Sequence, residues 1–214
     1  AGVSWNDVYP VYGIWTDGER ALEVTHSDGN LSTCLKVESV STRQEPSAKV
    51  TVIRMKDTAY PFYVNVCYRA YEDVDMIETW TEIENREKKP VKLTRFDSGS
   101  IPVRYGNVWL THLAGSANNE GRLIQEPLER GMLVLRNKDG VRNTHTDHPE
   151  VMFSLDGKPL EHTGQVIGAA LCYSGNYELR VHTHQGSYHE FYAGINPDNS
   201  AYTLEPKEIF TTPV

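Results

Sequence analysis

The sequence lacks any run of about 18 consecutive apolar residues, the length that a membrane-spanning helix requires. It is also poor in positive charge, because 21 Lys and Arg residues stand against 29 Asp and Glu residues and give a net charge of -8. Nucleic acids and anionic membrane surfaces bind basic faces, so neither is expected as a main partner. A neutral ligand such as a sugar is compatible with this charge.

Cysteine is scarce as well, with only Cys34, Cys67 and Cys172 in the chain. The odd count and the apolar surroundings predict buried free thiols rather than a disulfide framework. No C-x-x-C spacing is present, which argues against a zinc-thiolate site. A glycine-rich phosphate loop and a G-x-S-x-G nucleophile elbow are also missing. The sequence therefore predicts no cofactor.

Alternation of apolar and polar residues is the dominant pattern. It is clearest in FYVNVCYRA (62–70), IETWTEIE (77–84) and YELRVHTH (177–184), and a period of two indicates half-buried strands. Similar runs lie near residues 20–26, 31–38, 49–56, 91–97, 107–113, 131–136, 151–155, 166–173, 188–195 and 208–212. No segment has the pattern of an amphipathic helix of three turns. We expect one all-β domain over residues 1–214, built as a two-sheet sandwich.

Two long stretches show no alternation and are predicted to be irregular. They are Ala114–Gly131 and Asn137–Glu150. Long loops in compact domains tend to be functional or to cover another surface.

A row of carboxylates beside an aromatic residue is the first candidate for chemistry. Glu78, Glu82 and Glu84 share one strand face with Trp80. A glycosidase needs two carboxyl groups and a stacking surface, and residues two apart on a strand lie about 6.6 Å apart, which does not forbid catalysis. The alternative is a solvated outer face of the sheet, whose charge the following lysines neutralise.

Histidines form the second candidate. His182 and His184 lie on one strand face, as in a metal-binding H-x-H pair, and His189 follows after a turn. If the turn is tight, alternation directs His189 to the opposite face, which weakens the cluster. A further group at 145–148 lies on a loop. Exposed polar strand positions explain the first group, and loop hydrogen bonds among His145, Asp147 and His148 explain the second, better than a metal does, so no metal site is assigned from the sequence.

Several segments stand out in order along the chain, namely YPVYG (9–13), ALEVTHSDGN (21–30), YPFYVNVCYRAYEDVDMIETWTEIEN (60–85), DGVRNTHTDHP (139–149), LCYSGNY (171–177), GINPDNSAYTLEP (194–206) and FTTP (210–213). Taken together, these segments resemble the N-terminal domain of glycoside hydrolase family 36 α-galactosidases. The resemblance implies a β-supersandwich of two large, mostly antiparallel sheets, similar to galactose mutarotase. It also implies that LEPKEIFTTPV (204–214) is the last sandwich strand before a linker to a catalytic barrel.

In that family the barrel holds both catalytic aspartates and removes α-linked galactose with retention of configuration. The resemblance therefore implies an accessory domain with no catalytic residue of its own, a C-terminal barrel in the same polypeptide as its partner, and homo-oligomers. It slightly favours a periplasmic or secreted location over a cytoplasmic one. A stand-alone carbohydrate-binding module, in which Trp15 or Trp80 stacks on sugar rings, is the alternative.

One loop carries the substrate-binding residues that the resemblance implies. In the family, a G-x-G-D-Y-R-x-P segment near the N-terminus reaches a galactose pocket, and GIWTDGERAL (13–22) stands in its place. Trp15, Asp17 and Arg20 then offer a stacking platform, a hydrogen-bond acceptor and a fork-shaped donor for sugar hydroxyls. The residues differ from the family pattern, and an ordinary surface turn is the equal alternative.

Overall fold

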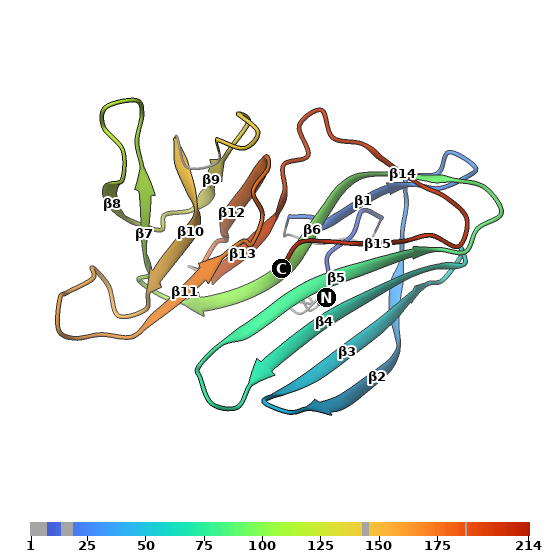
Figure 1. Ribbon diagram of the computed structural model, residues 1–214, viewed down its shortest axis with the longest axis horizontal. Helices are drawn as coiled ribbons and strands as arrows, with labels where there is room; N and C mark the ends of the chain where they lie inside the picture. The colour runs from blue at the N-terminus through green and yellow to red at the C-terminus, as the bar shows by residue number, and fades with distance from the viewer. Residues whose placement is uncertain (1–7, 14–18, 143–145, 187) are drawn as a thin grey trace. The chain divides into compact units, whose positions relative to one another are not determined.

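A computed structural model describes residues 8–13, 19–142, 146–186 and 188–214 (Figure 1). Every regular element in these residues is a β-strand, so the all-β supersandwich prediction is confirmed. No helix in the described part of the chain is long and apolar enough to cross a membrane. The chain divides into two compact units, unit 1 (residues 1–99 and 197–214) and unit 2 (residues 100–196). The single domain over residues 1–214 stays a prediction.

Unit 1 contains an antiparallel sheet with the strand order β15-β5-β4-β3-β2. The strands are β2 (Leu35–Glu45), β3 (Ala48–Asp57), β4 (Phe62–Tyr71), β5 (Ile77–Asn85) and β15 (Ile209–Thr211). The long strands β2 to β5 lie side by side in Figure 1. In β4 the predicted alternation is confirmed from Phe62 to Val66, where Phe62, Val64 and Val66 are buried while Tyr63 and Asn65 are only partly covered. It ends there, because Cys67 on the opposite face is buried as well.

The remaining strands of unit 1 pair with the first part of a long strand, β6 (Val91–Tyr105). These are β1 (Leu22–Thr25) and β14 (Tyr202–Leu204), both antiparallel to β6. Leu22 lies opposite Phe96, and Tyr202 lies opposite Leu93. Leu22, Leu93 and Leu204 have no exposed surface, so this part of β6 lies in the core of unit 1. From Ser100 on, β6 belongs to unit 2.

Unit 2 contains one antiparallel sheet in the order β11-β10-β7-β8 and a second group in the order β13-β12-β9, with β13 next to β6. The strands are β7 (Trp109–Ala114), β8 (Arg122–Pro127), β9 (Gly131–Arg136), β10 (Asp147–Ser154), β11 (Val166–Ala170), β12 (Tyr177–Thr183) and β13 (Tyr188–Ile195). Leu110, Phe153, Tyr177, Leu179 and Phe191 belong to one continuous core cluster.

The structure differs from the sequence-based expectation where strands are exposed or unusually buried. Strand β8 lies within the stretch predicted to be irregular, and β2 extends to Glu45. Both end a sheet order and expose most of their residues, so neither carries the apolar alternation that identifies a half-buried strand. Strand β12 was expected to be half-buried, but residues on both of its faces are buried.

Candidate functional site

The predicted sugar-contacting loop is described only in part. Trp15 and Asp17 lie outside the described residues. The Arg20 guanidinium carbon lies 4.3 Å from the centre of the Tyr12 ring, and its Nη1 atom lies 3.5 Å from Glu23 Oε1. The Arg20 side chain is 43% exposed, so its contacts with Tyr12 and Glu23 hold it at the surface of unit 1.

The carboxylates of β5 are each engaged by a donor from the same sheet. Glu78 accepts hydrogen bonds from Arg69 Nη1 at 2.7 Å and from the Tyr71 hydroxyl at 2.9 Å. Glu82 accepts one from Asn65 Nδ2 at 3.1 Å. Each of these carboxylates thus has a hydrogen-bonded partner within the sheet.

Glu84 is held by two arginines. It accepts from Arg54 Nη2 at 3.1 Å and from Arg86 Nε. Burial acts to raise the pKa of Glu84, but the hydrogen bonds and charges of Arg86 and Arg54 outweigh it and hold the pKa below its usual value. A glycosidase acid needs a raised pKa, so this carboxyl group is suited to an ion pair rather than to proton donation.

Aromatic rings in this face are covered by arginines. The Arg69 guanidinium carbon lies 5.2 Å from the Trp80 ring centre, and those of Arg54 and Arg86 lie 4.4 and 4.9 Å from the Tyr63 ring centre. Cations at these distances are attracted by the ring quadrupole. The row of Glu and Trp that suggested a glycosidase is therefore an interleaved ion-pair and cation–π network, which stabilises the sheet.

A second polar group in unit 1 was not expected from the sequence. His26 Nδ1 lies 2.7 Å from Glu87 Oε1, and its Nε2 lies 3.1 Å from Thr33 Oγ1. Tyr60 stacks on the imidazole with ring centres 3.8 Å apart. The order hydroxyl, imidazole, carboxylate is that of a nucleophilic triad. However, the His26 side chain is fully buried and Thr33 is 2% exposed, so no substrate has access and the group is structural.

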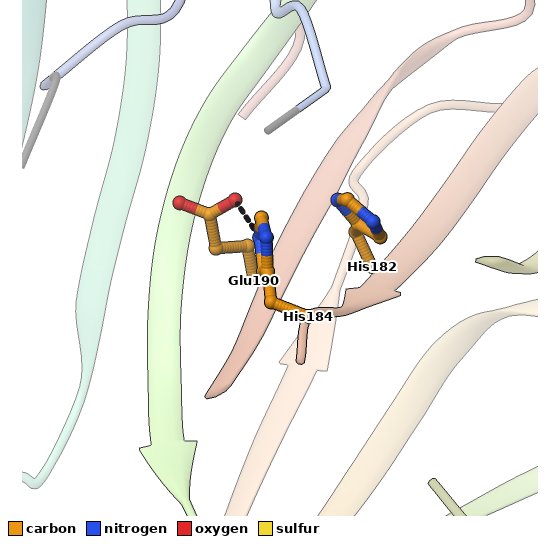
Figure 2. A group of neighbouring side chains, drawn as sticks. All are labelled: His182, His184 and Glu190. Carbon is orange, nitrogen blue, oxygen red and sulfur yellow. Dashed lines mark hydrogen bonds and ion pairs between the residues drawn. The ribbon is translucent and has the colours of Figure 1, made fainter. Parts of the chain in front are cut away.

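In unit 2 the structure brings together His182, His184 and Glu190, as Figure 2 shows. His184 Nε2 lies 2.8 Å from Glu190 Oε2, and the two imidazole centres lie 4.0 Å apart. The potential ligand atoms of the three side chains all lie within 4.8 Å of one another. Sequence analysis found the two histidines but missed Glu190. Placing the β12–β13 hairpin in register would have found it, because His182 lies directly opposite Glu190.

His189 lies on the other face, as the alternation predicts. Its ring is fully buried, with Nδ1 2.9 Å from Thr183 Oγ1 and Nε2 2.9 Å from the Gly106 carbonyl oxygen. Burial lowers the pKa of His189, although the Gly106 carbonyl acts to raise it. A buried neutral imidazole that bridges a hydroxyl and a carbonyl is a structural element.

The group at 145–148 does not form one cluster in the described residues. His145 lies outside them. His148 Nδ1 is 3.1 Å from Glu150 Oε1, while Asp147 Oδ1 is 3.9 Å from His112 Nδ1. His148 and Asp147 therefore contact different partners.

The sequence model of the glycosyl hydrolase family 36 N-terminal domain matches residues 3–205. Two relatives are α-galactosidase AgaA of Geobacillus stearothermophilus, 26% identical over 96% of this chain, and α-galactosidase Mel36A of Lactobacillus acidophilus, 26% identical over 80% of it. The matched regions make up 30% and 23% of those proteins. The chain thus spans less than a third of the relatives that it matches.

Solved structures agree with this assignment. The crystal structure of AgaB from Geobacillus stearothermophilus has a TM-score of 0.90 and 26% identity, and that of AgaA has a TM-score of 0.89 and 25% identity. Each comparison covers 96% of this chain and 30% of the other. Since sequence and fold match over nearly the full length of the chain, it belongs to the family of glycosyl hydrolase family 36 N-terminal domains.

Proposed function

We propose that this chain is the accessory domain of an α-galactosidase and supports a catalytic barrel in the same polypeptide. The observation that carries the proposal is the unequal coverage, since 96% of this chain matches only 30% of AgaA. The catalytic machinery then belongs to the remaining part of such an enzyme. A retaining mechanism with a carboxylate nucleophile and an acid/base carboxyl group, acting on α-galactosides, completes the proposal.

The contacts of the described carboxylates support the proposal that the catalytic residues belong to another part of the enzyme. Glu78 and Glu84 are held by arginines, and the pKa of Glu84 lies below its usual value. Carboxylates in such ion pairs stabilise a scaffold and are poor proton donors. A scaffold role for unit 1 accounts for both features.

Comparison of this chain with the complete gene product tests the proposal. We expect the complete protein to hydrolyse p-nitrophenyl α-galactoside and to leave the β-galactoside intact, whereas the 214-residue chain hydrolyses neither. Turnover by the chain alone that disappears in Glu78→Gln, Glu82→Gln or Glu84→Gln would overturn it. Millimolar or tighter binding of galactosides by the chain alone would instead favour a stand-alone carbohydrate-binding module.

We further propose that the loop with Trp15, Asp17 and Arg20 contacts the galactose unit in the complete enzyme. The surface position of Arg20 supports this, because its guanidinium stays accessible while Tyr12 and Glu23 orient it. Arg20→Ala in the complete enzyme should raise KM about tenfold or more, the loss expected for a hydrogen bond from a charged group. Arg43→Ala, which removes an exposed arginine paired with Glu45, is the control, and equal KM values for the two variants would refute the proposal.

Self-association of the complete enzyme is the last part of the proposal. The resemblance to family 36 α-galactosidases supports it, and light scattering coupled to size-exclusion chromatography tests it. A monomer over the working concentration range would refute this part alone.

A further inference from the structure

The face of β12 and β13 that carries His182, His184 and Glu190 has no role in the function proposed above. We propose that these three side chains form a binding site for a divalent transition metal of the zinc type. The inference does not depend on the galactosidase assignment, since it rests on the geometry of unit 2 alone.

The sheet itself fixes which residues meet. Side chains two apart on a strand share a face, so His182 and His184 point the same way from β12. The antiparallel register places Glu190 of β13 opposite His182 and places Thr183 opposite His189 on the other face. Two paired strands are a more rigid support for a metal site than a loop is.

The ligand set suits zinc and its neighbours in the transition series. Two imidazole nitrogens and one carboxylate oxygen are the protein ligands of zinc sites that leave a fourth position for water. Calcium and magnesium prefer oxygen ligands, and two of the three atoms here are nitrogen. Cobalt, nickel and copper bind the same kind of donors, so they serve as probes.

The distances require small adjustments only. In a tetrahedral site with bonds of about 2.0–2.2 Å, neighbouring ligand atoms lie roughly 3.3 Å apart. The observed ligand atoms lie within 4.8 Å of one another, and the His184–Glu190 pair lies at 2.8 Å. In Figure 2 His184 and Glu190 form the hydrogen-bonded pair and His182 lies apart from them. A metal ion would take the place of the proton between that pair, and a rotamer adjustment of His182 would bring the third ligand closer.

Surrounding residues orient the carboxylate and hold it partly away from water. The Tyr192 hydroxyl donates a hydrogen bond to Glu190 Oε2 at 2.9 Å. Such an outer partner orients a metal-binding carboxylate. The side chains of His184 and Glu190 are 6% and 14% exposed, and His182 is partly exposed.

The local charge does not oppose a cation. Arg180 shares the face with the histidines, but its Nε atom lies 3.3 Å from Glu178 Oε1 and its guanidinium carbon lies 5.0 Å from the Tyr192 ring centre. From the other neighbouring strand, β9, Met132 lies opposite His182. Glu190 thus supplies the negative charge at the site.

The test is a titration of the untagged, EDTA-stripped 214-residue chain with Zn²⁺ by calorimetry and with Co²⁺ by visible absorption. We expect one ion per chain and the absorption bands of a tetrahedral or five-coordinate Co²⁺ site with nitrogen ligands. Zinc at 100 times its Kd should raise Tm by about 5–10 °C, because binding to the folded state alone stabilises it.

His182→Ala, His184→Ala and Glu190→Gln should each weaken binding at least tenfold. His148→Ala is the matched control, because His148 and Glu150 form a similar hydrogen-bonded pair on β10 that belongs to no three-ligand group among the described residues. Circular dichroism checks the folding of each variant. Should His184→Ala fail to fold, His182→Ala and Glu190→Gln decide the matter, since His182 lies at the more open side. Absence of binding at about 100 μM Zn²⁺, or binding that only His148→Ala removes, would overturn the proposal.

Discussion

Replacement of Glu84 by glutamine tests whether the ion pairs of Glu84 with Arg54 of β3 and with Arg86 just beyond β5 stabilise unit 1. The carboxylate accepts hydrogen bonds from Arg54 and Arg86, and its side chain is 12% exposed. A hydrogen bond to a charged group contributes about 1.5–3 kcal/mol. Arg86 is 51% exposed, so its share is screened by water. We therefore expect Glu84→Gln to cost about 2 kcal/mol at neutral pH.

The pH dependence of this loss follows from the direction of the pKa shift. The pKa of Glu84 in the folded protein lies below the ordinary value of 4.5, so the ionised form stabilises the fold. This contribution is complete above the pKa of the unfolded chain and disappears as the pH falls through the pKa of the folded state. The difference between Glu84→Gln and the parent should be largest at neutral pH and shrink as the pH falls below 4.5.

Urea unfolding followed by circular dichroism measures the effect. A loss of about 2 kcal/mol corresponds to a midpoint shift of about 1 M urea. Glu38→Gln is the matched control, because Glu38 binds the same Arg54 at 3.2 Å but is 45% exposed, and it should cost less than about 1 kcal/mol. Equal losses for the two variants, or an equal loss by Glu84→Gln at pH 7 and at acid pH, would refute the reasoning.

Three further predictions concern the cysteines, a buried histidine and a tight turn. Burial, with a smaller contribution from Glu82, raises the pKa of Cys67 to about 12. Iodoacetamide at pH 8 should therefore modify the exposed Cys172 first and Cys67 only after unfolding. Mass spectrometry of timed samples checks the order of modification. His26→Leu leaves the buried Glu87 carboxylate without its imidazole and should cost about 3 kcal/mol in urea unfolding, which a loss below 1 kcal/mol would contradict. A Cβ atom on Gly115 would lie 2.6 Å from a backbone oxygen of the same loop, so Gly115→Ala should lower the free energy of unfolding by about 1–3 kcal/mol. Thermal unfolding measures the loss. Gly168→Ala is the control, because a Cβ atom at Gly168 meets open space.

Much of the fold follows from sequence alternation, because residues with one buried face carry a visible period of two. This is why the buried face of β4 was predicted correctly from Phe62 to Val66, although Cys67 on the other face is buried too. Strand β8 and the part of β2 beyond residue 38 were not predicted, since an edge strand with exposed side chains has no buried face to impose a pattern. The cysteines are free as predicted, but only Cys67 is buried, whereas Cys34 is partly buried and Cys172 is exposed. Cys34 lies just before β2, and Cys172 lies beyond the end of β11.

The candidate sites depend on pairing between strands, which a single strand pattern does not contain. From the sequence alone, Glu78 and Glu84 suggested catalysis. The structure shows that Glu78 is bound by Arg69 of β4, and that Glu84 is bound by Arg54 of β3 and by Arg86 just beyond β5. His182 and His184 were visible as a pair, whereas Glu190 joins them only through the hairpin register. The prediction for Trp15 and Asp17 stays open, since both lie outside the described residues.

Strand β2, at the edge of the five-stranded sheet of unit 1, contains a β-bulge that opposes strand-to-strand association with other chains. The pairing of β2 with β3 skips Glu38, so that Val37 faces Met55 while Ser39 faces Arg54. Such a bulge bends a strand and interrupts the regular row of amide groups on which a foreign strand could add. Because Val37 and Val40 are exposed beside it, loss of this extra residue would straighten an apolar border and favour fibre-like stacking of chains.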